Sequence, residues 1–296
     1  MRLALLGLGL IGGSVGRAAH AAGWHVAAWT PSGTGPRIAR EQGAIDVAAP
    51  TLLDAVGGAD LVVLAAPPTA CLELLDALAG LRGTALRPDV VVSDVASTKV
   101  LLGERAAALG VRFVGGHPMA GRETSGFEAG SIDLLRDRPW VVVPPPAGDD
   151  PAVALVEELA RACGARPLRM TAVDHDAAVA AISHLPLVVS AALVEAVAGA
   201  PGTPVPAGWP AAAALAASGW AGATRLARGD PAMGAGIAAT NAEPLAAAVR
   251  AMRDRLAEWL LLLENGTATV AGVDLPDEEA LRARFAATRA RLEDRG

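Results

Sequence analysis

The chain has no tyrosine and only one lysine, Lys99, among its 296 residues. Without tyrosine it cannot belong to the short-chain reductases, whose Tyr-x-x-x-Lys pair moves a proton to or from the substrate oxygen. Any mechanism that depends on a lysine must use Lys99. These two absences exclude whole classes of enzyme.

Cysteine and basic charge are also scarce. Cys71 and Cys163 lie far apart in apolar segments without metal-ligand spacing, so we interpret them as buried thiols in a reducing cytoplasm. The formal net charge of -6 offers no basic field for nucleic acid. No cluster of His, Cys, Asp and Glu has ligand spacing. We therefore expect neither a metal nor a nucleic-acid partner.

Long uninterrupted apolar runs are absent as well. Gly, Pro or charged residues break every candidate before it reaches the roughly 18 to 20 residues of a membrane span. The start of the chain has the charged residue and apolar run of a secretory signal, but its glycine spacing favours a buried strand followed by a turn. We expect a soluble, unprocessed, cytoplasmic protein with no membrane partner, and 296 residues that are 52% hydrophobic suffice for two domains.

The glycines near the start form a dinucleotide-binding pattern. A predicted strand at 3–6 is followed by Gly7-Leu-Gly9-Leu-Ile-Gly12, a helix at 14–22 and a second strand at 24–29. Gly7 permits the tight turn, Gly9 lets the backbone approach a pyrophosphate, and Gly12 allows close helix packing. The cofactor-binding residues that we expect are Gly7, Gly9, Leu10, Ile11, Gly12, Thr30, Ser32, Ala66, Pro67 and Ser97.

The end of the second strand bears on the choice of cofactor. NAD-binding proteins usually carry Asp or Glu there for the ribose 2'-hydroxyl, whereas this chain has Thr30-Pro-Ser32. No carboxylate at this place repels a 2'-phosphate, both hydroxyls can bind one, and Arg37 follows closely. The sequence favours NADP, and the alternative is NAD held through a hydroxyl or a backbone group.

The remaining pattern predicts an α/β fold with two domains. Apolar strands at 59–66, 89–94, 112–115, 139–144 and 166–170 alternate with helices, which is typical of a Rossmann-type doubly wound parallel sheet. From Thr171 onward the sequence favours helices at 174–182, 187–197, 210–218, 243–265 and 277–295. We predict a dinucleotide-binding domain at 1–170 and an all-α helical substrate and dimerisation domain at 171–296. Because the helices are apolar on more than one side, we expect a homodimer.

Polar residues gather where two predicted strands end. Asp94-Val-Ala-Ser97-Thr-Lys99 follows one strand, and Gly115-Gly-His117-Pro-Met-Ala-Gly-Arg-Glu123 follows the next. A neutral imidazole at His117 can accept a hydroxyl proton while a nicotinamide takes a hydride. Ser97 is placed to orient the ring, and Glu123 to act as a second partner or to contact the substrate. His20, His25 and His175 are interpreted as surface or helix-packing residues.

Five blocks in order resemble the prephenate/arogenate dehydrogenase family. They are Gly7–Ser14, Asp94–Lys99, His117–Gly121 with Glu123 and Ser125-Gly126, Ser183-His-Leu-Pro186, and Thr224-Arg-Leu-Ala227 followed by Asp230-Pro231. They extend over most of the chain, to about Asn265. The resemblance implies oxidation of the ring C4 hydroxyl of prephenate or arogenate with NAD(P) and loss of the ring carboxylate as CO2, in tyrosine biosynthesis.

The resemblance also implies roles for individual residues. His117 accepts the hydrogen bond from the C4 hydroxyl, Ser97 orients His117 and the nicotinamide, and Arg225 binds a substrate carboxylate, which its forked donors match. Glu123, Arg122 and His184 are further substrate-binding candidates, although His184 at a helix start equally suits a structural role. Lys99 matches the lysine of the family motif and equally suits a structural cation at a strand-to-helix corner.

Three positions depart from the family pattern. Leu187 replaces the second histidine that often follows Ser-His-Leu-Pro in prephenate-using members, Arg122 replaces a small polar residue, and Gly234 replaces an aromatic one. Loss of the histidine favours arogenate or a related amino-substituted cyclohexadienyl acid as substrate. All three departures alter the expected pocket.

Two alternatives remain beside this interpretation. β-Hydroxyacid dehydrogenases have the same two-domain plan but use a lysine in the second domain, and this chain has none after Lys99. A non-catalytic NAD(P)-binding sensor needs no Ser97, His117 or Arg225, so the presence of all three disfavours it.

Overall fold

The computed structural model describes residues 1–296 except 85, 123, 125, 266–267, 271–272 and 295–296. The chain forms two compact units, Met1–Leu245 and Ala246–Gly296, which we describe separately.

The first unit contains an eight-stranded sheet of order β3-β2-β1-β4-β5-β6-β7-β8. Its strands are β1 (Arg2–Leu6), β2 (His25–Trp29), β3 (Val47–Ala48), β4 (Leu61–Leu64), β5 (Val91–Asp94), β6 (Phe113–Pro118), β7 (Pro139–Val143) and β8 (Arg166–Arg169). All neighbours pair in parallel except β6 and β7.

The antiparallel β6–β7 pair corrects the prediction of a wholly parallel sheet. A parallel crossover needs a helix long enough to pack on a face of the sheet. Between β6 and β7 the described residues form only the short 3-10 turn η1 (Phe127–Ala129), so the chain returns along the neighbouring strand. His117 therefore lies within β6, opposite Val141, and not in a loop after the strand.

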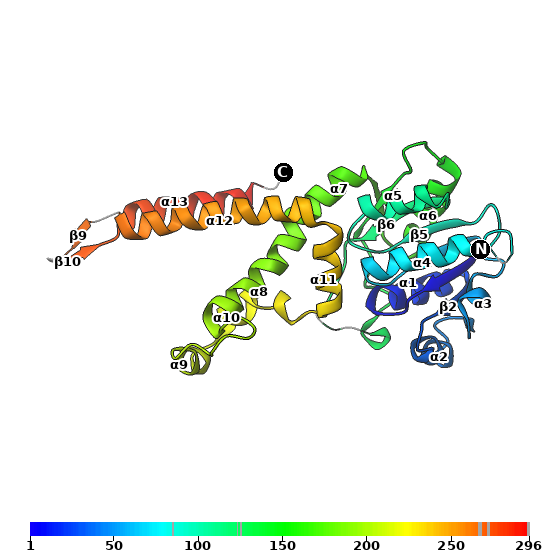
Figure 1. Ribbon diagram of the computed structural model, residues 1–296, viewed down its shortest axis with the longest axis horizontal. Helices are drawn as coiled ribbons and strands as arrows, with labels where there is room; N and C mark the ends of the chain where they lie inside the picture. Colours follow the sequence, from blue (N-terminus) through cyan, green and yellow to red (C-terminus); the bar gives the residue numbers. More distant parts are fainter. Residues whose placement is uncertain (85, 123, 125, 266–267, 271–272, 295–296) are drawn as a thin grey trace. The chain divides into compact units, whose positions relative to one another are not determined.

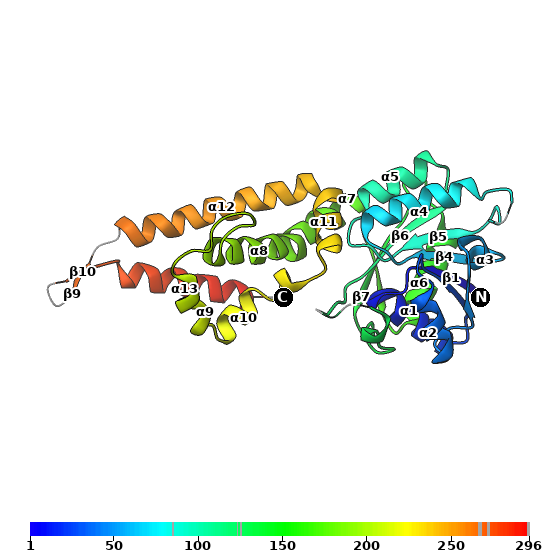
Figure 2. The same ribbon diagram turned by 60° about the horizontal axis from the view of Figure 1, so that its bottom comes forward.

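Helices cover both faces of the sheet (Figures 1 and 2). Residues on β1 alternate between the faces: Leu3 and Leu5 pack with one group of helices, and Ala4 and Leu6 with the other. The first group contains α1 (Leu10–Ala21), α2 (Thr34–Glu41) and α6 (Asp150–Ala162), and the second contains α3 (Leu52–Val56), α4 (Pro68–Gly80) and α5 (Val100–Ala108).

Helical segments complete the first unit. They are α7 (Ala172–Val179), the π-helical turn η2 (Ala180–His184), α8 (Leu185–Ala198), α9 (Trp209–Ala214), α10 (Ser218–Ala223), the 3-10 turn η3 (Leu226–Arg228) and α11 (Pro231–Thr240). The helix α11 packs on α4, and a Cβ on Gly236 would lie 3.2 Å from Cδ of Pro68. This contact joins the helical segments to the sheet.

The segments α7, η2 and α8 form one continuous 27-residue helix, Ala172–Ala198. By length and by its mean hydropathy of 2.1 it could cross a membrane, contrary to the expectation that proline or charge breaks every candidate. Pro186 follows the π-helical turn η2, where the regular α-helical hydrogen-bond pattern is already interrupted, so the chain accommodates it without ending the helix. However, His175, Asp176 and His184 are buried in the first unit and hydrogen-bonded there. Only 22% of the apolar window of this helix is buried among the described residues.

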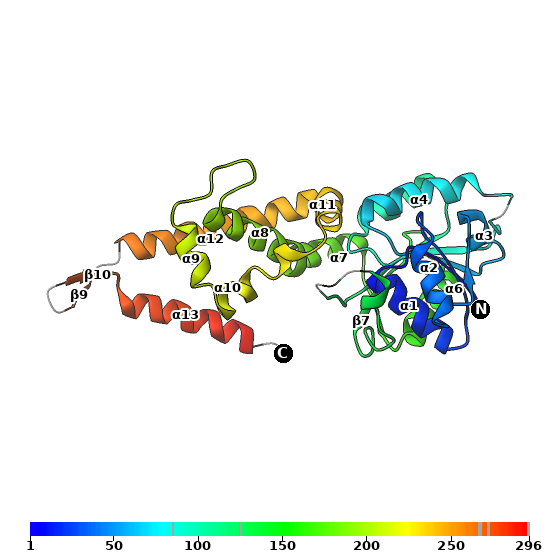
Figure 3. The ribbon, with the colours of Figure 1, turned by 90° about the horizontal axis from the view of Figure 1, so that it is seen from below.

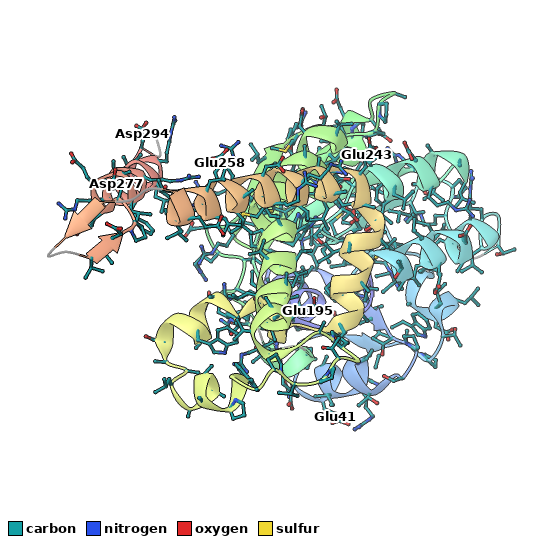
Figure 4. All side chains as sticks on the ribbon, turned by 60° about the vertical axis from the view of Figure 1, so that its left-hand side comes forward. Glu41, Glu195, Glu243, Glu258, Asp277 and Asp294 are labelled. Atoms are coloured by element: carbon teal, nitrogen blue, oxygen red, sulfur yellow. The ribbon has the colours of Figure 1, made fainter. Side chains whose placement is uncertain are left out.

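The second unit consists of most of α12 (Ala242–Asn265), the strands β9 (Ala268–Val270) and β10 (Val273–Leu275), and α13 (Glu278–Glu293). Figures 1 and 3 show α12 and α13 linked through the antiparallel β9–β10 ribbon, which the sequence analysis did not predict. Arg284 of α13 stacks 4.5 Å from the Trp259 ring and pairs with Glu258 at 2.9 Å; Glu258 is labelled on α12 in Figure 4.

Candidate active site

Three glycines shape the turn between β1 and α1. Gly7 has a φ of +110°, and a Cβ there would lie 2.2 Å from the carbonyl oxygen of Ala65. A Cβ on Gly12 would lie 2.6 Å from the Gly7 oxygen, whereas one on Gly9 would meet nothing within 4 Å. The turn is closed toward the protein and open at Gly9, beside the first N–H groups of α1, which lack helical partners. This cradle fits the pyrophosphate of a dinucleotide.

The loop after β4 lies against the glycine turn. A Cβ on Gly7 would be only 3.2 Å from the backbone nitrogen of Ala66, and Pro67 is the cap residue of α4. The sheet therefore brings the predicted cofactor residues Ala66 and Pro67 to Gly7. The Cys71 thiol donates to the Ala66 oxygen at 3.3 Å, and burial raises its pKa to about 12, so it is an unreactive buried thiol, as predicted.

A cleft of about 460 Å³ lies between the end of β2 and η1. Thr30 and Ser32 line it as predicted, and the structure adds Thr34 and Glu128; the other lining residues are Leu8, Gly9, Gly35, Ile38, Gly126 and Phe127. Arg37 is turned to Glu41 at 2.9 Å on the surface of α2, where Figure 4 labels Glu41. The cleft thus presents three hydroxyls and one carboxylate. The sequence analysis predicted two of the hydroxyls and missed Thr34 and Glu128.

The corner between β5 and α5 holds a buried ion pair. Lys99 and Asp94 contact each other, and both side chains are fully buried. Asp94 also accepts hydrogen bonds from the backbone N–H of Ala96 at 2.9 Å and of Gly116 at 3.0 Å. Burial raises the pKa of the Asp94 carboxyl, whereas Lys99 and the two amides lower it. Lys99 therefore acts as a structural cation, which is one of its two predicted roles.

Two glycines let β6 pack against this corner. A Cβ on Gly115 would lie 2.9 Å from Cδ of Lys99, and one on Gly116 would lie 2.5 Å from the carbonyl oxygen of Asp94. Side chains at these positions would push β6 away from β5. The Gly-Gly pair therefore fixes the position of the next residue, His117.

His117 contacts a histidine that is distant in sequence. Its Nδ1 lies 2.8 Å from Nε2 of His175, and Nδ1 of His175 lies 2.7 Å from Oδ1 of Asp176. His175 and Asp176 are 1% and 2% exposed. The interpretation of His175 as a surface or helix-packing residue without a role in the site was therefore wrong, because α7 places its ring against the His117 ring.

The environment keeps His117 neutral. Burial lowers the pKa of its imidazole well below the ordinary value of 6.5, and His175, Lys99 and His184 lower it further. Since Nδ1 faces His175, Nε2 is the nitrogen available to a ligand. A neutral imidazole with one available nitrogen can accept a hydrogen bond from a substrate hydroxyl.

Ser97 does not orient the His117 ring in this structure. Its hydroxyl is buried and has no hydrogen-bond partner among the described residues, while the His117 contact is made by His175. The hydroxyl of the neighbouring Thr98 bonds Thr240 of α11 at 2.9 Å, which fixes the loop against the helical segments. The Ser97 hydroxyl is left available for a cofactor or substrate atom.

His184 is held by an asparagine that the sequence analysis did not identify. Nδ2 of Asn241 donates to the backbone oxygen of Asp176 at 2.8 Å and lies 3.0 Å from Nδ1 of His184. Burial is the main cause that lowers the pKa of His184, to about 4. Nε2 of His184 and Oδ1 of Asn241 are buried without a partner among the described residues, so both suit contacts to a ligand.

The other substrate-binding candidates lie on the surface or outside the described residues. Arg225 is exposed and directly precedes η3, which is tied to α8 by a 3.0 Å bond from the Ala227 N–H to the Ser190 hydroxyl. Arg122 is exposed and bonds the Ala129 oxygen at 3.5 Å. Glu123 lies outside the described residues. Their substrate contacts stay predictions.

Comparison with known proteins places this arrangement in a family. A family model described as "Prephenate dehydrogenase, nucleotide-binding domain" matches residues 26–168, and one described as "Prephenate dehydrogenase, dimerization domain" matches residues 171–269. The chain belongs to the prephenate dehydrogenase family.

Individual relatives agree with this assignment. The prephenate dehydrogenase of Bacillus subtilis (strain 168) is 30% identical over 86% of this chain and 66% of its own length, so the chain spans about two thirds of that relative. The structure of Synechocystis arogenate dehydrogenase is 31% identical, with a TM-score of 0.72 over 88% of this chain and 91% of that one. The prephenate dehydrogenase from A. aeolicus, in complex with hydroxyphenyl propionate and NAD+, is 25% identical, with a TM-score of 0.82 over 99% and 98%.

Two departures from the prephenate dehydrogenase pattern meet in the fold. A Cβ on Gly234 would lie 3.7 Å from Cδ2 of Leu187. The positions where the family often has an aromatic residue and a second histidine are therefore neighbours, on α11 and α8. At this place Gly234 removes the volume of the aromatic side chain, and Leu187 removes the polarity of the histidine.

The residues missed by sequence reasoning left a weak signal. His175 and Asp176 form a polar pair in an otherwise Ala- and Val-rich helix, and Asn241 is one of only two asparagines in the chain. Polar groups in apolar segments are buried only when they are hydrogen-bonded. Such a pair is therefore a candidate for a buried network, although its partner cannot be read from the sequence.

Proposed function

We propose that the chain catalyses the NAD(P)-dependent oxidative decarboxylation of prephenate or arogenate, a step of tyrosine biosynthesis. The observation that carries the proposal is the neutral His117, whose Nδ1 is occupied and whose Nε2 is available. It lies on a strand parallel to β5, in the sheet that carries the glycine turn at the carboxyl end of β1. Doubly wound sheets bind their ligands at this edge.

The cofactor, when bound on Gly7, Gly9 and Gly12, supplies a nicotinamide that accepts a hydride. His117 accepts a hydrogen bond from the C4 hydroxyl while C4 loses the hydride. The bond to the ring carboxylate then breaks, CO2 leaves, and the released electron pair completes the aromatic ring. The C4 hydroxyl proton moves to Nε2 of His117 as the hydride leaves and returns to the product oxygen as the ring becomes aromatic, so no second acid is needed.

Charged and polar groups of the chain hold the substrate in this proposal. Arg225 binds a substrate carboxylate through two parallel hydrogen bonds, and His184 donates from Nε2. Ser97 contacts the nicotinamide and the substrate hydroxyl, and Arg122 and Glu123 contribute further polar contacts. The buried polar atoms of Ser97 and His184 that lack partners among the described residues support these roles.

For the cofactor we propose NADP in preference to NAD. Thr30, Ser32 and Thr34 place three hydroxyls in the cleft beside β2, and hydroxyls donate hydrogen bonds to phosphate oxygens. Glu128 in the same cleft opposes this preference through its charge. NAD held by the same hydroxyls is the alternative.

The decisive experiment is steady-state kinetics with prephenate and arogenate, each with NAD and with NADP. We expect turnover with at least one substrate, accompanied by CO2 release in equal amount to the reduced cofactor. Reduction of cofactor without CO2 release would contradict the proposed reaction. Activity with none of the four combinations would favour a non-catalytic NAD(P)-binding sensor or a related amino-substituted cyclohexadienyl acid as substrate.

The contact between Leu187 and Gly234 supports arogenate as the better substrate, because this part of the pocket has no imidazole donor for a pyruvyl group. We expect Leu187→His to lower KM for prephenate relative to KM for arogenate by roughly 3- to 10-fold, the worth of one modest hydrogen bond. Leu187→Met keeps the site apolar and is the matched control. An equal change for both substrates would refute this specificity role.

We also propose a cytoplasmic homodimer, with residues 1–170 binding the dinucleotide and residues 171–296 binding substrate and forming the dimer. The family model described as a dimerization domain supports this, as do exposed apolar side chains of the helical segments, among them Val173, Ile182, Leu256 and Leu260. Sedimentation equilibrium should give twice the chain mass of 29.7 kDa. A monomer at micromolar concentration would contradict the proposed assembly.

A further inference from the structure

A chain of three side chains leads from α7 to the reactive face of His117. Asp176 contacts His175 at 2.7 Å, and His175 contacts Nδ1 of His117 at 2.8 Å. We infer that His175 and Asp176 are positioning residues that fix the tautomer of His117, with the proton on Nδ1 and the lone pair on Nε2. The inference about catalysis rests on the proposed function, whereas the tautomer itself does not.

The direction of the hydrogen bonds follows from the carboxylate. Oδ1 of Asp176 accepts from the backbone N–H of Lys99 at 2.8 Å, and Oδ2 accepts from that of Val100 at 2.9 Å. An ionised carboxylate only accepts hydrogen bonds. The proton in its contact with His175 therefore belongs to Nδ1 of His175.

The second link follows from the first. A neutral imidazole that is protonated on Nδ1 carries its lone pair on Nε2. Nε2 of His175 consequently accepts, and Nδ1 of His117 donates across the 2.8 Å contact. The opposite direction would need a second proton on His175, whose side chain is only 1% exposed. With Nδ1 protonated, Nε2 of His117 is an acceptor for the substrate hydroxyl.

The geometry of the chain is fixed by the fold. The His117 and His175 rings meet edge to face, with centroids 5.1 Å apart and planes at 79°. Asp176 binds the first residues of α5 through the N–H groups of Lys99 and Val100. The α5 corner and α7 therefore hold one another, and His175 cannot rotate without breaking two contacts.

The same Asp176 also sets the polarity of His184. Its backbone oxygen accepts from Nδ2 of Asn241, and because a carbonyl oxygen only accepts, this fixes the orientation of the amide. Nδ1 of His184, 3.0 Å from the same Nδ2, must accept, so the proton of neutral His184 lies on Nε2. One residue thus gives the site an imidazole acceptor at His117 and an imidazole donor at His184.

The tautomer can be measured without any substrate. We would record the ¹⁵N spectra of ¹⁵N-histidine-labelled protein at pH 7.5, with His117→Asn and His175→Leu used for assignment. The expected wild-type pattern is a protonated Nδ1 and an unprotonated Nε2 for His117. In His175→Leu the Nδ1 proton loses its acceptor, and His117 should change to a mixture of tautomers. His25→Leu, at an exposed position of β2, is the control and should leave the His117 signals unchanged.

Kinetics then separate positioning from general folding. We expect His175→Leu to lower kcat by roughly 100-fold or more, as for other bases that lose their tautomer, with KM for substrate and cofactor changed less than about 3-fold. His175→Gln offers an amide oxygen to Nδ1 of His117, so it should recover at least about 10-fold of this loss.

Two results would overturn the inference. One is a wild-type His117 protonated on Nε2, and this needs no variant that has to fold. The other is a folded His175→Leu protein with unchanged tautomer and kcat. Absence of turnover in the wild type, with the expected ¹⁵N pattern, would refute the proposed function and leave the tautomer assignment standing.

Discussion

At the scale of single residues, His117 combines a hydrogen bond through Nδ1 with a pKa that stays well below 6.5. Of the other histidines, His20 is partly exposed beside Asp46 and His25 is exposed, so neither has such surroundings. Both ring nitrogens of His175 are engaged, and Nδ1 of His184 faces Asn241. We therefore expect the base function to depend on position 117.

Replacing this base tests that statement. We expect His117→Asn to lower kcat by about 10²- to 10⁴-fold, the usual contribution of a general base, while the dissociation constant of the cofactor changes little because the glycine turn lies on other strands. Stopped-flow kinetics and cofactor fluorescence titration measure the two quantities. His25→Asn serves as the control, and unchanged turnover of His117→Asn would remove the assigned role.

Arg225 permits a second test at this scale. Arg225→Ala should raise KM for the substrate by roughly 10- to 100-fold, as expected when a charged hydrogen-bond pair of about 1.5 to 3 kcal/mol is lost, and should leave KM for the cofactor nearly unchanged. Arg225→Lys keeps the charge but not the fork, so it should recover only part of the affinity. The neighbouring exposed Arg228→Ala is the control. A defect confined to the cofactor constant would contradict substrate binding by Arg225.

The residues of the site could be predicted only where their neighbours in the sequence determine their position. His117 was found because it follows Gly115 and Gly116 at a strand end, and these glycines are needed where Lys99 and Asp94 pack. His175 was missed because its contact spans 58 residues of sequence. The expected contact between Ser97 and His117 is not made among the described residues, where the Ser97 hydroxyl has no hydrogen-bond partner.

At the scale of elements, the β5–α5 corner depends on the buried pair of Lys99 and Asp94. We expect Lys99→Met to lower the free energy of unfolding by about 3 to 5 kcal/mol, because it leaves a buried carboxylate unpaired. Urea titration followed by circular dichroism measures this. Arg37→Met breaks an exposed pair with Glu41 and should cost less than about 1 kcal/mol; equal costs for the two variants would show that the buried pair has no special role.

Helices and strands with a clear hydrophobic pattern were predicted. Those whose formation or direction depends on contacts between residues far apart in the sequence were not. The strands of the sheet and the helices α6, α8, α12 and α13 follow from apolar runs and caps. The direction of β7 could not be predicted, because it depends on the missing crossover helix. α11 was missed because its apolar residues, interrupted by Gly234 and Gly236, have no helical period; the helix forms where it packs on α4.

At the scale of the whole molecule, buried neutral histidines make stability depend on pH. The pKa of His184 is lowered to about 4 and that of His117 is also lowered, whereas in the unfolded chain both titrate near 6.5. The unfolded state therefore binds protons first, and the stability present above pH 6.5 is lost as pH falls toward 4.

The measurement is the urea midpoint between pH 7.5 and 4.5. We expect it to fall steadily below pH 6.5, and His184→Asn should reduce the slope because one of the two groups no longer titrates. His25→Asn, at an exposed position of β2, is the matched control variant. A midpoint independent of pH over this range would contradict the burial of neutral histidines.

The single lysine has a practical consequence. Lys99 is only 1% exposed, so its amine is out of reach of acylating reagents while the β5–α5 corner is closed. Acylation of that one amine therefore counts opening events of the corner, and its rate reports the local free energy of opening. Because the chain has a single lysine, mass spectrometry can follow local opening through the extent of acylation at this one side chain.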